Sequence, residues 1–200
     1  RPGDTDRQVS VSELMWQRDV RHPFLVMYLN HIYDAYYEMY HKYPERQSEL
    51  LNSVMSVGNS RKSYFGGLMG LENEKLMARK IEFENQLKEK VASDPELEKK
   101  YGHIWKALTA LFEEKTEIGY KEFLYSLLPY RQPEYLSMAF QVYHLAQQLN
   151  FAEAERDEKY KSDNLETTLK EIYPEDFDEE LNKKLLEAFV ASVYHVLGVD

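Results

Sequence analysis

The 200-residue chain contains no cysteine. Disulfide bonds, zinc-thiolate sites and thiol nucleophiles are therefore excluded, and cysteine usage says nothing about the redox compartment. The sequence also lacks an apolar run of the length that a bilayer-spanning helix needs, about 18 residues or more, so a transmembrane helix is not expected. The chain begins with Arg1 and shows no signal peptide, which leads us to expect a processed or excised piece of a longer protein.

Basic residues are in the minority. The 25 lysines and arginines face 35 aspartates and glutamates, which gives a net charge of -10. Nucleic acids and anionic membranes attract clustered positive charge, so neither is expected as a partner. Hydrophobic residues make up 43% of the chain, enough to bury the core of one domain.

Strand-like alternation of useful length is absent, and apolar residues recur instead at helical spacing. Ser10 or Ser12 is expected to begin a short helix that ends near Val20, and His22-Pro23 is expected to break the chain. The next apolar stripe predicts a helix from Pro23 to about Lys42. Another helix is expected to begin at the Asp94-Pro95 start signal and to end or kink at Gly119. Three more are expected around the apolar stripes Phe123 to Leu128, Leu136 to Ala146 and Leu181 to Val193. The fold class is therefore all-α: an antiparallel helical bundle of six to eight helices.

One proline-free run, from Glu45 to Asp94, contains four glycines within the segment Gly58–Leu71. If residues 45–92 form one long helix, we expect a kink near Gly66-Gly67, since glycine costs a helix about 1 kcal/mol relative to alanine. Small residues recur roughly every 3.5 positions along this run, so they share one helix face. They are Ser56, Asn59 or Ser60, Ser63, Gly67 and Gly70. This pattern is compatible with close packing against another helix. It is equally compatible with a groove that binds a ligand or a neighbouring domain.

Catalytic chemistry has few candidates in this chain. Ser60 follows Gly58-Asn59, but Arg61 and Lys62 come next in a helical context, so no oxyanion hole is expected behind it. The six histidines form no His-Glu-x-x-His pattern, and adjacent carboxylates are expected on solvated helix faces. We expect no metal and no cofactor. The sixteen tyrosines are expected at helix seams rather than in a groove for peptide or sugar.

Three blocks occur in an order and spacing that carry a family resemblance. They are Arg1-Pro2-Gly3-Asp4-Thr5-Asp6-Arg7, then Gly58-Asn59-Ser60-Arg61-Lys62-Ser63 with Gly67 and Gly70-Leu71, and finally Phe177-Asp178-Glu179-Glu180-Leu181-Asn182-Lys183-Lys184. Together they resemble the bacterial serine dipeptidyl peptidases called dipeptidyl peptidases 7 and 11. The resemblance covers nearly the whole chain.

The resemblance implies that residues 1–200 are a single helical cap domain inserted in a chymotrypsin-like double barrel, with residues 1–8 as the linker from the preceding barrel half. The family's catalytic histidine and aspartate would precede Arg1, and its serine would follow Asp200. This segment alone would then be inactive. The family also implies a periplasmic location, a flanking barrel in the same chain and a homodimer.

The resemblance further implies the site residues. The cap gates the cleft of an enzyme that removes dipeptides from the free N-terminus of peptides, and an asparagine that corresponds to Asn59 binds the substrate amino group. Arg61 and Ser63 are candidate substrate-binding neighbours. Where familiar members have Tyr-Trp after that asparagine, this chain has Ser60-Arg61. An alternative from another class is a stand-alone helical interaction module that binds a peptide or partner helix through the small-residue face.

Overall fold

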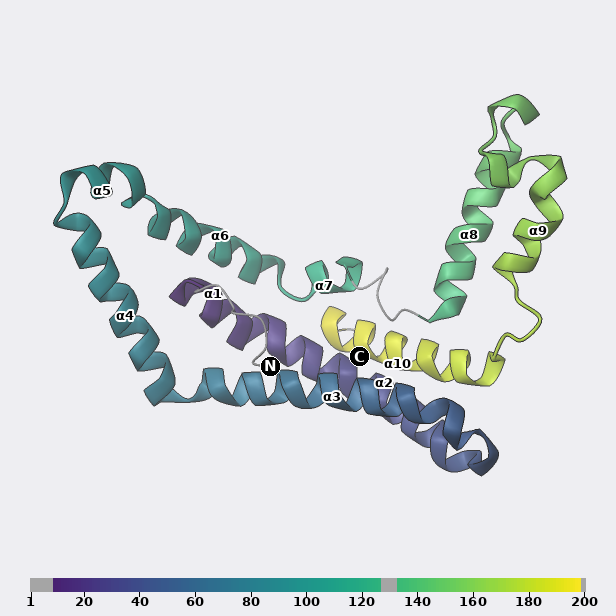
Figure 1. The fold of residues 1–200 in the computed structure, drawn as a ribbon, viewed down its shortest axis with the longest axis horizontal. Helices are drawn as coiled ribbons and strands as arrows, with labels where there is room; N and C mark the ends of the chain where they lie inside the picture. Colours follow the sequence, from purple (N-terminus) through teal and green to yellow (C-terminus); the bar gives the residue numbers. More distant parts are fainter. Residues whose placement is uncertain (1–8, 127–132, 199–200) are drawn as a thin grey trace. The chain divides into compact units, whose positions relative to one another are not determined.

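The computed structural model describes residues 9–126 and 133–198, and over these ranges the chain is helical with no β-strand (Figure 1). The all-α prediction is confirmed, and eight of the α-helices exceed six residues in length. The α-helices are α1 (Val11–Trp16), α2 (His22–Lys42), α3 (Gln47–Glu72), α4 (Glu74–Ala92), α5 (Pro95–Tyr101), α6 (Ile104–Ile118), α7 (Lys121–Ser126), α8 (Glu134–Leu149), α9 (Ser162–Ile172) and α10 (Glu179–Leu197). A π-helical turn, η1 (Gln17–Arg21), and three 3-10 turns, η2 (Pro44–Arg46), η3 (Glu153–Glu155) and η4 (Glu158–Tyr160), complete the elements.

The helices gather into two compact units. Of the described residues, the first unit combines 9–30 with 55–125, and the second combines 31–54 with 126 and 133–198. Helices α2 and α3 each contribute one part to either unit. The linker expected over residues 1–8 lies outside the described residues, and the assignment of the chain as one cap domain stays a prediction.

The core of the first unit is aromatic. Trp16 and Phe112 are buried with their rings 5.7 Å apart, and Leu108, Tyr120 and Phe123 pack around them. Phe24 joins this core through Phe123, with ring centroids at 5.2 Å. Burying a side chain of this size stabilises a fold by roughly 1.5–3 kcal/mol. These contacts therefore hold the start of α2 against α6 and α7.

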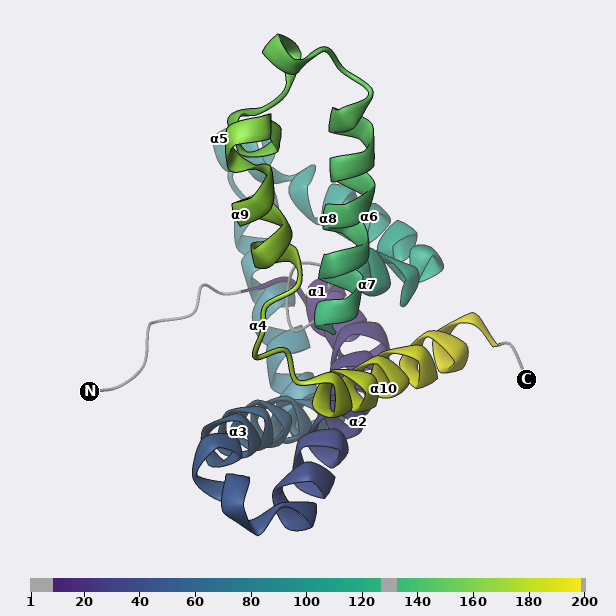
Figure 2. The same cartoon turned by 90° about the vertical axis from the view of Figure 1, so that its right-hand side faces the viewer.

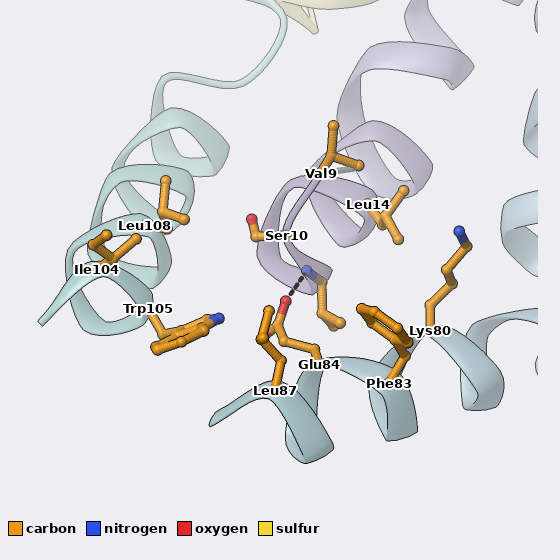
Figure 3. Close-up of a pocket in the computed structure, with 11 residues that line it drawn as sticks. Val9, Ser10, Leu14, Lys80, Phe83, Glu84, Leu87, Ile104, Trp105 and Leu108 are labelled. Atoms are coloured by element: carbon orange, nitrogen blue, oxygen red, sulfur yellow. Dashed lines mark hydrogen bonds between the residues drawn. The ribbon is translucent and has the colours of Figure 1, made fainter. Parts of the chain in front are cut away.

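Helix α1 lies along α6 and also touches α4, while α5 joins α4 to α6 (Figure 1). Ser10 is the N-cap of α1, as one of the two expected serines, and its Oγ accepts the Glu13 N–H. The Val11 N–H donates to the Glu84 carboxylate of α4 at 2.6 Å (Figure 3). Glu84 is only 8% exposed and also pairs with Lys88 at 2.7 Å. A buried carboxylate is thus satisfied by a helix N-terminus and a lysine.

The predicted kink at Gly66-Gly67 is wrong. Helix α3 runs through both glycines without interruption, and the break between α3 and α4 comes at Asn73. Glycine weakens a helix by entropy but removes no hydrogen bond. Asn73, by contrast, adopts an extended backbone, and its side chain accepts the Leu76 N–H as the N-cap of α4. The capping residue therefore decides where the long run divides.

The break predicted at His22-Pro23 is also wrong, because helix continues from α1 into α2. The π turn η1 lies immediately before the proline, and the His22 backbone N–H donates to Gln17 O, five residues earlier. Proline has no N–H to donate and crowds the preceding turn. A widened turn accommodates that defect without ending the helix. The predicted end of this helix near Lys42 is confirmed.

Further boundaries follow the sequence signals. Asp94 caps α5 with Pro95 at its first position, although the helix expected from there divides at Gly102-His103 into α5 and α6. Gly119 ends α6 with φ of 60°, a conformation that favours glycine. Part of the short helix expected to reach Leu128 falls beyond the described residues. Helix α9 has no counterpart among the predicted helices, although Leu165, Leu169 and Ile172 recur at helical spacing within its charged sequence.

The second unit is built around the turn between α2 and α3. Ile32 and Met39 of α2 and Leu50 of α3 are buried in this unit. Helix α10 packs on α2, where Ser192 is 0% exposed and its Oγ donates to Ala188 O. His31 Nδ1 therefore donates to Ser192 Oγ, at 2.8 Å. Helices α8 and α9 lie side by side in both views (Figures 1 and 2).

Ion pairs surround the same turn. Arg46 contacts both Glu49 and Asp178, and these hydrogen bonds raise its pKa above the ordinary arginine value. Lys42 and Tyr43 both donate to Glu180, and Lys184 pairs with Glu38 at 3.0 Å. Asn182, 3% exposed, bridges α10 and α8: its Oδ1 accepts the Glu134 N–H at 3.0 Å, and its Nδ2 donates to Asp178 O. The late sequence block thus serves as a structural junction.

None of the helices in the described ranges is both long enough and apolar enough to cross a membrane.

Replacing Glu84 tests the contact between α1 and α4. Glu84→Ala should lower the free energy of unfolding by about 2 kcal/mol, because the Val11 N–H loses a charged acceptor and Lys88 loses its partner. Glu84→Gln keeps an acceptor and should lose less. Denaturant unfolding measures both, with the exposed Glu89→Ala on the same helix as the control. Equal losses in Glu84→Ala and Glu89→Ala would contradict the assignment.

Asn182 offers a similar test in the second unit. Asn182→Ala should cost about 1–3 kcal/mol of unfolding free energy, since the Glu134 N–H at the start of α8 loses its acceptor and the buried Asn182 side chain is removed. Lys183→Ala, at the exposed neighbouring position, should change the stability by less than about 0.5 kcal/mol. Thermal unfolding followed by circular dichroism compares the two. A loss in Asn182→Ala no greater than in Lys183→Ala would refute the bridging role.

Candidate functional site

The candidate substrate-binding residues lie on the part of α3 that belongs to the first unit. Asn59 and Ser63 are both exposed, and four residues of helix separate them by roughly 40° around the axis. Arg61 is half-buried and lies roughly 200° from Asn59. The helix therefore brings Asn59 and Ser63 onto one face and directs Arg61 away from it. The substrate-binding role of all three stays a prediction.

The small-residue stripe divides into two parts. A Cβ added at Gly66 or Gly70 would meet no atom within 4 Å, so both glycines border open space. A Cβ added at Gly67 would lie 2.8 Å from Nε2 of His22. Close packing thus explains Gly67 alone among these three glycines. The open line that remains runs along the face of Asn59 and Ser63, extending towards Gly66 and Gly70.

An aromatic contact backs this part of α3. The rings of His22 and Tyr64 meet edge to face with centroids 5.6 Å apart. The Arg21 guanidinium lies 5.9 Å from the centre of the Tyr64 ring, within range of a cation–π interaction. Tyr64 and Gly67 are three residues apart, so they present neighbouring surfaces to the same histidine. Nothing in the sequence pointed to this contact, because His22 before Pro23 carried only the signal of a chain break.

The hydrogen bonds of His22 fix its ring. Its Nδ1 lies 3.0 Å from Gln17 O, and since a carbonyl can only accept, Nδ1 carries the proton. The neutral ring then has its lone pair on Nε2, the atom nearest Gly67. Burial lowers the pKa of His22 below the ordinary histidine value; the bond to Gln17 opposes this effect, and Arg21 adds to it. His22 is 8% exposed. The geometry therefore favours the neutral form.

Ser60 and Lys62 both lie within the regular helix α3. The Ser60 hydroxyl donates to Ser56 O at 3.0 Å, the usual back-bond of a helical serine. Lys62 is exposed on the helix surface. In the described ranges no three histidine or carboxylate side chains are gathered in a way that could hold a metal ion.

Two apolar cavities of the first unit lie away from Asn59. One, of about 240 Å³, lies between α1, α4 and α6 (Figure 3). Its walls come from Leu14, Phe83, Leu87 and Leu108, with the Glu84 carboxylate already engaged by Val11. The other, of about 380 Å³, lies where α5 joins α4 and α6. Neither cavity is lined by a candidate substrate-binding residue, that is, by Asn59, Arg61 or Ser63.

Comparison with known families supplies a match that covers the chain. The model of the Peptidase S46 family matches residues 1–200, the full length of the chain. The finding confirms the family resemblance drawn from the three sequence blocks. No curated protein matches the chain significantly.

The buried histidine predicts a pH dependence of folding. Because the pKa of His22 is lowered in the folded protein, the unfolded chain binds this proton more tightly. The free energy of unfolding should therefore be highest above the ordinary histidine pKa of about 6.5, and should fall as the pH drops through the lowered folded value. His31, whose pKa burial also lowers, contributes in the same direction.

The test is denaturant unfolding at about pH 8 and about pH 5. The loss of stability between the two pH values should be smaller in His22→Gln than in the unsubstituted protein. The comparison within each protein cancels the destabilisation that the substitution itself causes. An identical loss in both proteins would contradict the assignment.

Proposed function

We propose a function for this chain from the premise that it belongs to the Peptidase S46 family. The chain is a substrate-gating cap of a serine dipeptidyl aminopeptidase, and its task is to recognise the free N-terminus of a peptide. The observation that carries the proposal is the exposed face of α3 with Asn59 and Ser63 side by side on it. Membership in the family indicates the class of reaction, and the exposed face of α3 is the surface that would contact the substrate amino group.

Asn59 suits recognition of an ammonium group. Its side-chain oxygen accepts hydrogen bonds, whereas an ammonium group only donates them. Ser63, on the same face, offers a second acceptor. Arg61 is directed away by the helix, so its positive charge does not oppose the ammonium at this face. The net charge of -10 also favours the approach of a positive group.

Cleavage itself is assigned to residues outside this segment. In the proposed enzyme a double barrel of the same chain carries the serine, histidine and aspartate, and this segment alone is inactive. The Ser60 hydroxyl, engaged with Ser56 O, agrees with that division of work. The proposal includes the periplasmic location and the homodimer that the family resemblance implies.

The rival function is a stand-alone interaction module that binds a helix or peptide through the same face of α3. The family match over the whole chain favours the peptidase function, because the match is not confined to that face. The two functions differ in ligand chemistry: a cap for dipeptide release needs a free amino group, and a helix-binding module does not.

The central test replaces Asn59 in the intact parent protein and measures dipeptide release from peptides with free and with acetylated N-termini. The unsubstituted protein should cleave only the free-amine peptide. Asn59→Ala should lower kcat/KM for that peptide roughly 10- to 100-fold, the value of a hydrogen bond to a charged group.

The matched control is Asn52→Ala. Asn52 is also exposed on α3, seven residues earlier and therefore on nearly the same face. This variant should keep its kcat/KM within about twofold, because binding is specific to the amide at position 59. Loss of activity in both variants would indicate general damage to α3. Unchanged cleavage by a folded Asn59→Ala protein would refute the amino-terminal role.

A further inference from the structure

We propose that His22 and Gly67 act as a pair of positioning residues that sets where α3 presents Asn59. The inference rests on the proposed function and gives both residues a positioning role that neither the sequence nor the family comparison assigns. Neither residue touches the substrate in this proposal. They act through the packing of α3 against the junction of η1 and α2.

The contact between Gly67 and His22 leaves no room for a side chain. A Cβ at position 67 would lie 2.8 Å from Nε2 of His22, closer than real Cβ atoms approach their neighbours, and 3.1 Å from Cδ2, which is tighter than most such contacts. Glycine is therefore required for α3 to lie at its observed distance from the histidine. A Cβ added at Gly66 or Gly70 would meet nothing within 4 Å, so of these three positions only Gly67 requires glycine for packing.

The His22 ring is held in place and cannot easily move away from an added methyl group. Its Nδ1 is bound to Gln17 O, Tyr64 covers one edge, and the side chain is 8% exposed. The carbonyl of Gln17 also accepts the backbone N–H of His22, a five-residue bond that belongs to the π turn. The ring and its backbone are thus tied to one atom, and π turns occur frequently at functional sites.

The contact between Gly67 and His22 is linked to Asn59 through helix α3. Gly67 follows Asn59 by eight residues, about 12 Å along the axis, and α3 is regular helix over the whole interval. A regular helix carries a shift at one end to the other. A displacement of α3 at Gly67 therefore moves Asn59 as well, and misplacement by about 1 Å can cost 100-fold in rate or binding.

The experiment compares Gly67→Ala, His22→Ala and the double variant in the intact parent protein, with Asn59→Ala alongside. Gly67→Ala should raise KM for the free-amine peptide about tenfold and change kcat less, since the contact with the amino group is made in the bound state and retained afterwards. In the His22→Ala background the new methyl has room, so adding Gly67→Ala should change KM by less than about twofold. Gly66→Ala is the folding control and should not destabilise the protein, because its methyl meets open space.

The outcomes separate the two proposals. If Asn59→Ala loses activity but Gly67→Ala only lowers stability and leaves KM unchanged, the positioning role is overturned and the amino-terminal role stands. If Asn59→Ala changes nothing, both proposals fail. If Gly67→Ala does not fold, His22→Ala alone decides: a selective rise in KM for the free-amine peptide supports positioning, and an unchanged KM overturns it.

Discussion

Burial of one face of α2 is the constraint on which both units depend. Phe24, Tyr28 and Leu29 are buried in the first unit, and Ile32, Ala35 and Met39 in the second. Each of the larger side chains contributes roughly 1.5–3 kcal/mol through burial alone. Trp16 and Val20, which precede Pro23, are buried as well, so the chain has to stay helical through a residue that usually ends a helix. The π turn before Pro23 resolves this conflict, because it absorbs the missing hydrogen-bond donor while the helix direction continues.

The same turn has a second consequence. By bringing Gln17 O within reach of both the backbone and the ring of His22, it immobilises a histidine that faces α3. Gly67 meets that histidine, and its neighbours Gly66 and Gly70 do not. The glycines of α3 therefore have two different roles. Gly67 leaves room for the His22 side chain, and Gly66 and Gly70 leave an open helix face beside Asn59 and Ser63. Family membership gives that open face a candidate ligand, the amino terminus of a peptide.

Charged side chains do different work in the two units. In the first, the buried Glu84 accepts a helix N-terminal N–H, so its loss should be felt as destabilisation. In the second, Arg46, Asp178 and Glu180 tie the turn between α2 and α3 to the start of α10. Most of these ion pairs are partly exposed, and such pairs contribute modestly, while the buried amide of Asn182 and the Ser192–His31 bond are shielded from water. The acidic block late in the sequence is thus best understood as a structural junction.

The sequence by itself determined the all-α class, the cap at Asp94, the ends near Lys42 and Gly119, and the family, because periodicity, capping chemistry and short motifs are local properties. At the start of α1 it left Ser10 and Ser12 as alternatives. It also brought forward Asn59 and Ser63, though only through resemblance. It misplaced the break in the long helix, since a capping asparagine and a run of glycines cannot be ranked without knowing what each touches. Only the tertiary structure decided that Pro23 lies within a continuing helix and that Gly67 meets His22 across 45 residues of sequence. Such contacts depend on how separate helices pack, and helical periodicity along one segment contains no information about its partner.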